Sequence, residues 1–367
     1  MTTIHPITRA AGDAPRLQEL AAELAAAPYI GLDTEFLREK TYRPLLCLLQ
    51  LATRERFECV DPLGDMDLSP LQGALGTGGP IKIMHAARQD LEVLWPLFGP
   101  IGPLFDTQVA AALTGLPAQV GYADLVRRHF GVELDKSHTR TDWSRRPLSD
   151  AQLAYAIEDV RHLGPLRERL LEQLDKLGRI AWLLEEMSPL QAGDGLFVDP
   201  ECAHDRLKGL QDLDEDRRRL GQRLAAWRER RAADRNRPRT WILDDAGLKA
   251  LIAEAPRDLA GLQSLPELTA GFIENSGSEI LGVIEAAGMP ARLPPLPGRT
   301  RPDPKLGEDV KRLGSIVREV ANSLTLAPEL LATRRDLEVI ARGGLDALPL
   351  RGWRRSVVGD ALLAARQ

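Results

Sequence analysis

Residues 29–36 combine the pattern of a buried strand with two acidic residues at alternate positions. Side chains two positions apart lie on the same face of a strand, so Asp33 and Glu35 point in the same direction. Two neighbouring carboxylates repel each other unless a positive charge lies between them, and a divalent cation would supply it. An exposed strand end with two solvated acids fits the same octapeptide, so the rest of the chain has to decide.

The segments around this strand predict a mixed sheet covered by helices. Apolar runs predict further strands at residues 44–52, 56–61, 81–86 and 105–107. Helical spacing predicts helices at residues 17–27, 89–97 and 108–113, which places Asp90 in a first helical turn. Three strands joined by short connections, followed by alternating helix and strand, indicate five strands in a mixed sheet.

A further helix is predicted to begin at Asp150. Ser149 is suited to be its N-cap, and Gln152 three residues later completes a capping box. One arc of this helix is apolar and contains Leu153, Ile157 and Val160. Tyr155 and Asp159, four residues apart, share a different stripe, where they form either a functional pair or an ordinary surface pair.

The four acids Asp33, Glu35, Asp90 and Asp159 come from three segments that the predicted sheet brings to one edge. Ligation by oxygen alone suits magnesium or manganese rather than zinc. Four carboxylates can hold two such ions about 4 Å apart, the arrangement that promotes phosphodiester hydrolysis. Tyr155 has an ordinary pKa near 10, which makes it a poor free base, so we expect it to orient the water.

Length and composition predict a globular protein of two or three domains. We expect a soluble cytoplasmic protein without a membrane segment, because no leader pattern or long apolar run occurs and the three cysteines are scattered.

A helix is expected to run to about Met187, followed by a linker at residues 188–200. Leucine spacing predicts another helix from Leu207 to Pro238. Six prolines at residues 290–304 indicate a stiff connector before helical residues 305–367.

Positive charge is concentrated in one segment, although the net charge is -5. Residues 217–239 contain ten arginines and two acids, a local charge of +8. An acidic site repels phosphates, so we expect this segment to supply the contacts to a phosphate-containing substrate. The residues expected to make the contacts are Arg228, Arg230, Arg231 and Arg235. Ordinary solvated helix surface is the alternative, because 40 of the 48 basic residues are arginine.

Three motifs resemble those of the DEDD superfamily of exonucleases. They are Leu32-Asp33-Thr34-Glu35-Phe36, the segment His85-Ala-Ala-Arg-Gln-Asp90, and Tyr155-x3-Asp159, which is similar to the tyrosine subclass. Residues 134–143 and 146–149 resemble the ribonuclease D family in particular. This resemblance implies a ribonuclease H-like domain at residues 1–200, two divalent cations, and 3′-to-5′ exonuclease activity on RNA with a free 3′ end, including precursor tRNA.

Beyond the linker, residues 225–228 and 277–281 resemble the helical HRDC domain of the same family. The resemblance implies one such domain at residues 201–289, a linker at 290–304, and by position a second, divergent one at 305–367. It also implies that Lys136, Arg140 and Trp143 lie near the active-site mouth, where Trp143 either stacks on a base or packs in the core.

Other functional classes fit the sequence less well. The pairs Asp33-Thr34 and Asp106-Thr107 lack the glycine that an aspartic protease requires after each pair. A helicase would need a Walker loop, and the sequence contains none. A DNA-directed exonuclease of the same chemistry and a catalytically silent RNA-binding relative stay as alternatives, although the four acids disfavour the silent one. We expect a monomer.

Overall fold

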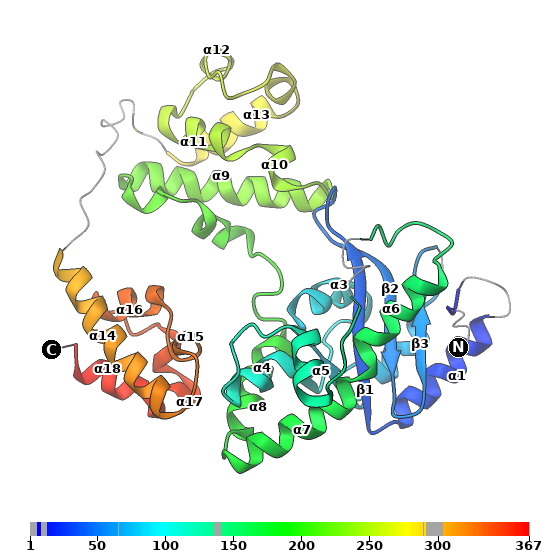
Figure 1. Ribbon diagram of the computed structural model, residues 1–367. Helices are drawn as coiled ribbons and strands as arrows, with labels where there is room; N and C mark the ends of the chain where they lie inside the picture. Colours follow the sequence, from blue (N-terminus) through cyan, green and yellow to red (C-terminus); the bar gives the residue numbers. More distant parts are fainter. Residues whose placement is uncertain are drawn as a thin grey trace. The chain divides into compact units, whose positions relative to one another are not determined.

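The computed structural model describes residues 6–8, 13–64, 66–135, 141–288, 290 and 304–366. The chain divides into two compact units, whose elements are labelled in Figure 1. The first unit comprises residues 1–37, 46–196 and 302–367, and the second comprises residues 38–45 and 197–301. Within the described residues, no helix is both long and apolar enough to cross a membrane.

The first unit is built on a five-stranded sheet in the order β3-β2-β1-β4-β5. Its strands are β1 (Tyr29–Leu37), β2 (Leu45–Ala52), β3 (Phe57–Val60), β4 (Ile81–Met84) and β5 (Leu104–Asp106). β1 is parallel to β4 and β4 to β5, whereas β2 and β3 are antiparallel. The expected mixed sheet is therefore confirmed. All but the first residue of β2 is buried, as is typical of a strand covered on both faces.

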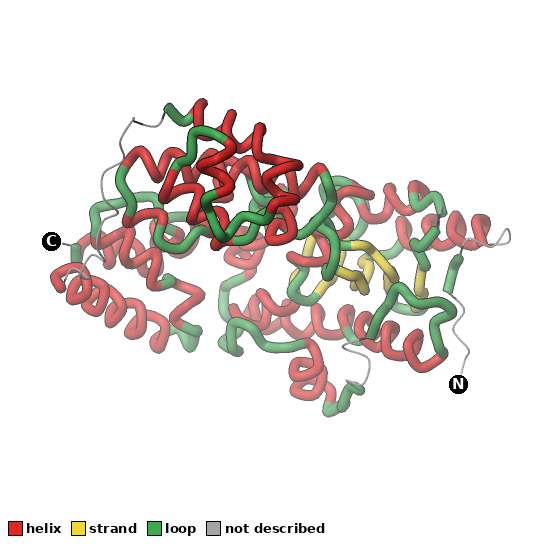
Figure 2. The backbone as a smooth tube through the Cα atoms, turned by 90° about the horizontal axis from the view of Figure 1, so that it is seen from above, coloured by secondary structure: helices red, strands yellow, loops and turns green. Residues whose placement is uncertain are grey.

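Helices pack along this sheet and carry the rest of the core (Figure 2). They are α1 (Asp13–Ala26), α2 (Gln72–Leu75), α3 (Arg88–Phe98), α4 (Thr107–Leu113), α5 (Tyr122–Phe130), α6 (Asp150–Arg161), α7 (Leu163–Lys176) and α8 (Ile180–Ala192). Helices α6 and α7 contact β1, and α8 contacts β5. The order of elements brings two helices that follow the fifth strand in sequence onto the first strand of the chain.

The helical region after α6 extends further than the sequence indicated. We expected it to end near Met187, but α8 continues through Pro189 to Ala192. Leu190 is buried in the core of the first unit, which favours continuation. Gly193 then ends the helix with φ +81°, a left-handed conformation that glycine adopts without strain.

The second unit is helical and has a separate core. Its helices are α9 (Glu215–Asp234), α10 (Arg239–Ile242), α11 (Asp245–Glu254), α12 (Leu259–Gln263) and α13 (Ala270–Ala286), preceded by 3-10 turns at Pro200–Arg206 and Leu210–Asp212. The expectation of one helix from Leu207 to Pro238 is wrong at its start. Gly209 is left-handed at φ +88° and the Asp214 carboxylate caps α9, so the long helix begins only at Glu215.

The carboxyl-terminal segment contains α14 (Pro304–Ser323), α15 (Pro328–Leu331), α16 (Arg334–Ala341), α17 (Gly352–Arg354) and α18 (Asp360–Ala364), with short turns at Leu348–Leu350 and Arg355–Gly359. We expected a separate domain here, whereas the segment shares the first unit and its core with the sheet. Trp353 stacks on Trp182 of α8 at 4.3 Å between ring centroids. Arg179 donates to the carbonyls of Leu113 and Leu324, each at 2.7 Å.

Candidate active site

Strand β1 presents two of the predicted site residues. Ile30 and Leu32 are fully buried on one face, so Asp33 and Glu35 share the other. Gly31 lies beneath the end of α6, because a Cβ at this position would lie 3.3 Å from the carbonyl oxygen of Val160. The absence of a side chain at Gly31 thus lets α6, which carries Asp159, approach the strand that carries Asp33.

Asp90 lies in the first turn of α3, as the sequence predicted. Its carboxylate is 7% exposed and accepts a hydrogen bond from the hydroxyl of Thr34. Thr34 lies between Asp33 and Glu35 on β1, so a short polar contact connects the first and second motifs. The second acidic segment is therefore held directly against the first.

Helix α6 begins at the predicted capping box, in which Ser149 and Gln152 cap each other's backbone. The predicted apolar arc is buried and contains Leu153, Ile157 and Val160. Burial raises the pKa of the Asp159 carboxyl, and a hydrogen bond from the Tyr155 side chain offsets part of this rise. The phenol and the acid that share a stripe in the sequence are thus in direct contact.

The four acids lie close enough for the charge of one to raise the pKa of another. Burial first, then the charges of Asp90, Asp159 and Glu35, raise the pKa of Asp33 well above its usual value. Burial and the charges of Asp159 and Asp90 raise the pKa of Glu35 to about 8. Burial raises the pKa of Asp90 and of Asp159 to about 7 each. Carboxyls with such values are disfavoured as anions until a cation joins them.

The donor set fits divalent cations that prefer oxygen ligands. Four carboxylates and no sulfur or imidazole ligand match magnesium or manganese. Among the described residues, no three His, Cys, Asp or Glu side chains converge closely enough to enclose an ion. Asp90 and Asp159 instead accept hydrogen bonds from Thr34 and Tyr155. The fold therefore gathers the four acids, and the hydroxyls of Thr34 and Tyr155 use part of the acceptor capacity of Asp90 and Asp159.

Asp106 supports the site, although the sequence analysis considered it only in connection with a protease. Its carboxylate accepts hydrogen bonds from the backbone of Ala86 at 3.0 Å, Ala87 at 2.8 Å and Gln108 at 2.8 Å. Ala86 has φ +56°, a strained value for a residue with a side chain. The carboxylate therefore fixes the turn that leads into α3 and Asp90. Its position immediately before a helix was the available sequence signal, because aspartate is a preferred N-cap.

Tyr122 is a second residue that the sequence analysis missed. Its hydroxyl donates to the carbonyl of Glu158 at 3.0 Å and accepts from the backbone N–H of His162 at 3.1 Å. Burial raises its pKa, and the charges of Asp159 and Asp33 add to this effect. Tyr122 thus joins α5 to the end of α6 beside the acids, and no local sequence pattern indicates this contact.

The predicted nucleic-acid contacts near the site have different outcomes. Lys136 and Arg140 lie outside the described residues. Trp143 is 2% exposed, so it packs in the core and its ring is not available to stack on a base. Its ring lies 6.1 Å from that of Tyr155, where it helps to hold the phenol in place.

The arginines of α9 divide into structural and exposed residues. Arg228 is 4% exposed and donates to the carbonyl of Leu243 at 3.0 Å and to Asp245 at 2.8 Å, so the expected RNA contact is wrong for this residue. Arg231 pairs with Glu279 at 2.7 Å and Arg230 with Glu201. Of the four arginines expected to bind RNA, only Arg235 is exposed without an ion pair in the described structure.

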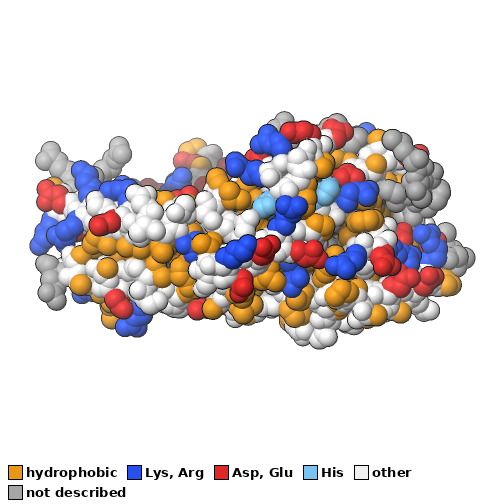
Figure 3. All heavy atoms as spheres, turned by 60° about the horizontal axis from the view of Figure 1, so that its bottom comes forward, with side chains coloured by type: hydrophobic (Ala, Val, Ile, Leu, Met, Phe, Trp, Pro, Cys, Tyr) orange, Lys and Arg blue, Asp and Glu red, His pale blue; other side chains and the backbone are white. Residues whose placement is uncertain are grey.

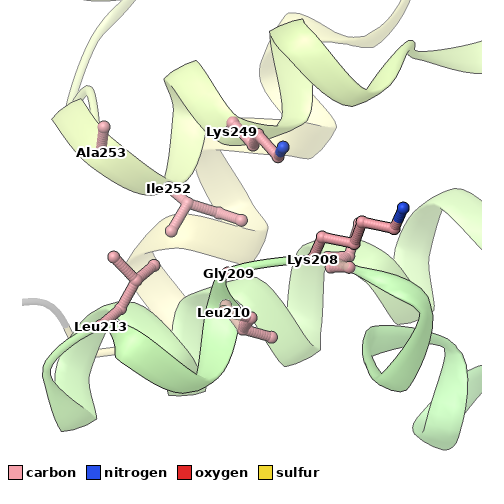
Figure 4. A pocket seen from close by; sticks show the side chains of 8 residues that line it. Lys208, Gly209, Leu210, Leu213, Lys249, Ile252 and Ala253 are labelled. Atoms are coloured by element: carbon pink, nitrogen blue, oxygen red, sulfur yellow. The ribbon is translucent and has the colours of Figure 1, made fainter. Parts of the chain in front are cut away.

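Basic and acidic side chains mix on one face of the protein, and the second unit contains a cavity outside the acidic site. The face drawn in Figure 3 carries basic and acidic side chains interspersed, so no field of one sign covers it. The second unit contains a cavity of about 260 Å³, lined by apolar residues with Lys208 and Lys249 beside them (Figure 4). None of its lining residues belongs to the predicted site.

Comparisons with known proteins agree with these features. Residues 9–175 match the family described as 3′-5′ exonuclease, and residues 217–284 match the HRDC domain. The chain is 39% identical to ribonuclease D of Gluconacetobacter diazotrophicus and 40% identical to that of Granulibacter bethesdensis, over 95% of this chain and 90% of each relative. The structure of Escherichia coli RNase D has a TM-score of 0.86 and 32% identity, covering 100% of this chain and 98% of that one.

Proposed function

The chain belongs to the ribonuclease D family and is a 3′-to-5′ exoribonuclease, and we propose that it trims the 3′ ends of precursor tRNA and other small structured RNA. The observation that supports this proposal is the electrostatic proximity of four carboxyls from β1, α3 and α6, of which Asp90 is buried and the other three are partly buried. The Escherichia coli relative is described as an exoribonuclease involved in structured RNA processing, which supports a structured substrate.

Dependence on divalent metals is general in this family. We propose that Asp33, Glu35, Asp90 and Asp159 hold two such ions, Mg²⁺ or Mn²⁺. A bound pair would activate water and neutralise charge on the phosphodiester. The remaining chemistry belongs to the side chains of the protein. The Tyr155 hydroxyl, held by Asp159, orients the attacking water, and the Thr34 hydroxyl restrains Asp90.

A degradation assay tests this function. Single-stranded RNA and DNA of the same sequence, labelled at the 5′ end, are incubated with Mg²⁺, Mn²⁺ or chelator. We expect stepwise shortening of the RNA with metal only, and none with Asp33→Asn, which removes one ligand while leaving the fold intact. Equal turnover by Asp33→Asn would contradict the site, and preferential shortening of the DNA would contradict the proposed substrate.

We further propose that the enzyme is monomeric and cytoplasmic. Cys47 and Cys59 are buried and form no disulfide in the described part of the chain, which agrees with a reducing compartment. Lys136 and Arg140 stay proposed phosphate contacts near the site, and residues 305–367 stay proposed as a divergent HRDC-like fold. Sedimentation at several protein concentrations tests the monomer, because self-association would raise the apparent mass.

A further inference from the structure

Trp241 differs from the other tryptophans of the chain in its exposure. All six tryptophans lie in the described residues, and the other five are at least partly buried. The side chain of Trp241, in the short helix α10, is 59% exposed. A single exposed apolar residue is ordinary on a protein surface, so its surroundings decide whether it has a role.

The surroundings of Trp241 are strongly basic. Arg235, Arg237 and Arg239 precede it, with no acid between positions 235 and 241, although Asp234 ends α9 just before them. The guanidinium of Arg237 lies 5.9 Å from the Trp241 ring centroid. In the described structure neither Arg235 nor Arg237 forms an ion pair.

Asp245, the acid four residues after Trp241, is already engaged. The hydrogen bond from the buried Arg228, at 2.8 Å, lowers the pKa of Asp245, and the charge of Arg239 lowers it further. From Asp234 to Trp241 the chain has three arginines and one acid, so this segment keeps a net positive charge.

The loop at residues 38–45 brings Arg43 to the same segment. The backbone N–H of Arg43 donates to the side-chain oxygen of Asn236 at 3.0 Å, and the Tyr42 hydroxyl donates to Glu229 at 2.7 Å. Figure 1 shows this loop beside the carboxyl end of α9. Asn236 has φ +46°, a left-handed conformation, so the chain leaves the helical path between Arg235 and Arg237. The side chains of Lys40 and Arg43 are exposed.

We propose that Trp241, Arg43, Arg235 and Arg237 form a binding platform for single-stranded RNA. A base stacks on the indole, while the guanidinium groups contact the neighbouring phosphates. This inference rests on the proposed function, because the occupant is the RNA substrate. An exposed aromatic ring among unpaired arginines matches a polyanion with planar bases better than it matches an apolar protein surface. Arg43 follows Glu35 by eight residues, so the platform is covalently connected to the catalytic strand.

Binding measurements on the full chain test the platform. A labelled single-stranded RNA is titrated in chelator, where no hydrolysis occurs, at several salt concentrations. Trp241→Ala is expected to raise Kd about five- to tenfold, near the lower end of the range for one stacked base, without changing the salt slope. Trp241→Phe should recover much of the affinity. The pair Arg235→Gln and Arg237→Gln should reduce the log-log slope by about 1.4, at about 0.7 per contact.

Leu259→Ala is the matched control, because Leu259 is a similarly exposed apolar residue of the second unit, at 52%. It should leave both affinity and slope unchanged. The platform is overturned if Trp241→Ala binds RNA as the wild type does, or if it changes only self-association of the protein. Failure of the proposed function is a separate result, since it would appear as wild-type protein that leaves RNA intact with either metal.

Discussion

The Asp106 carboxylate acts on the site through the backbone that it holds. Asp106→Asn replaces one accepting oxygen with an N–H group that faces backbone donors. We expect a loss of about 1–3 kcal/mol of stability from unsatisfied backbone groups. We also expect a lower kcat at nearly unchanged KM for RNA, and a higher metal concentration for half-maximal rate, because Asp90 is displaced. Asp67→Asn is the control, since Asp67 caps an exposed turn at Ser69. An unchanged metal requirement would make Asp106 purely structural.

The Tyr155 hydroxyl can be removed with little change in packing. Tyr155→Phe keeps the ring against Trp143 but loses the hydrogen bond to Asp159. Because a mispositioned reactant is costly, we expect the single-turnover rate to fall about 10- to 100-fold with nearly unchanged RNA affinity. Rapid-mix kinetics and a binding titration measure the two quantities separately. Equal rates for Tyr155→Phe and the wild type would show that Tyr155 and Asp159 form only an ordinary surface pair.

The raised pKa of Glu35 makes the metal-free protein sensitive to pH. Its folded pKa is about 8 against an ordinary 4.5, so the unfolded chain ionises first as pH rises. This carboxyl therefore destabilises the folded state progressively from about pH 4.5 to about pH 8. In chelator, Tm should decline over this range, and Glu35→Gln should flatten the decline. Parallel curves for the two proteins would contradict the pKa shift.

The arginines of helix α9 have two different roles. Arg228 is buried and donates to the buried Leu243 carbonyl and to the exposed Asp245, whereas Arg223, five residues earlier, is exposed. Arg228→Gln should lower stability by about 1–3 kcal/mol, because it leaves the buried Leu243 carbonyl without its partner. Arg223→Gln should change stability by less than about 0.5 kcal/mol, as surface substitutions do. Denaturant titration compares the two, and equal losses would refute the distinction.

Across the whole first unit, the carboxyl-terminal segment and the sheet share one core. Trp353 is 5% exposed, stacks on Trp182, and donates its indole N–H to Glu186 at 2.8 Å. Trp353→Ala should therefore destabilise the nuclease sheet itself, by about 3–5 kcal/mol. Hydrogen exchange at β1 and β4 measures this, since a separate domain would leave those strands fully protected. Leu345→Ala, at an exposed position, is the control.

The sequence alone determined the features that depend on local spacing. The alternation of acids in β1, the capping box of α6 and the four-residue spacing of Tyr155 and Asp159 follow from strand and helix periodicity. Tertiary structure alone decided which residues of one type are buried. Trp143 packs inside while Trp241 is exposed, and Arg228 binds Asp245 while Arg235 meets solvent. The same holds for Asp106 and for the terminal segment, whose partners are distant in the chain. Burial depends on such long-range contacts, which residue type and periodicity do not encode.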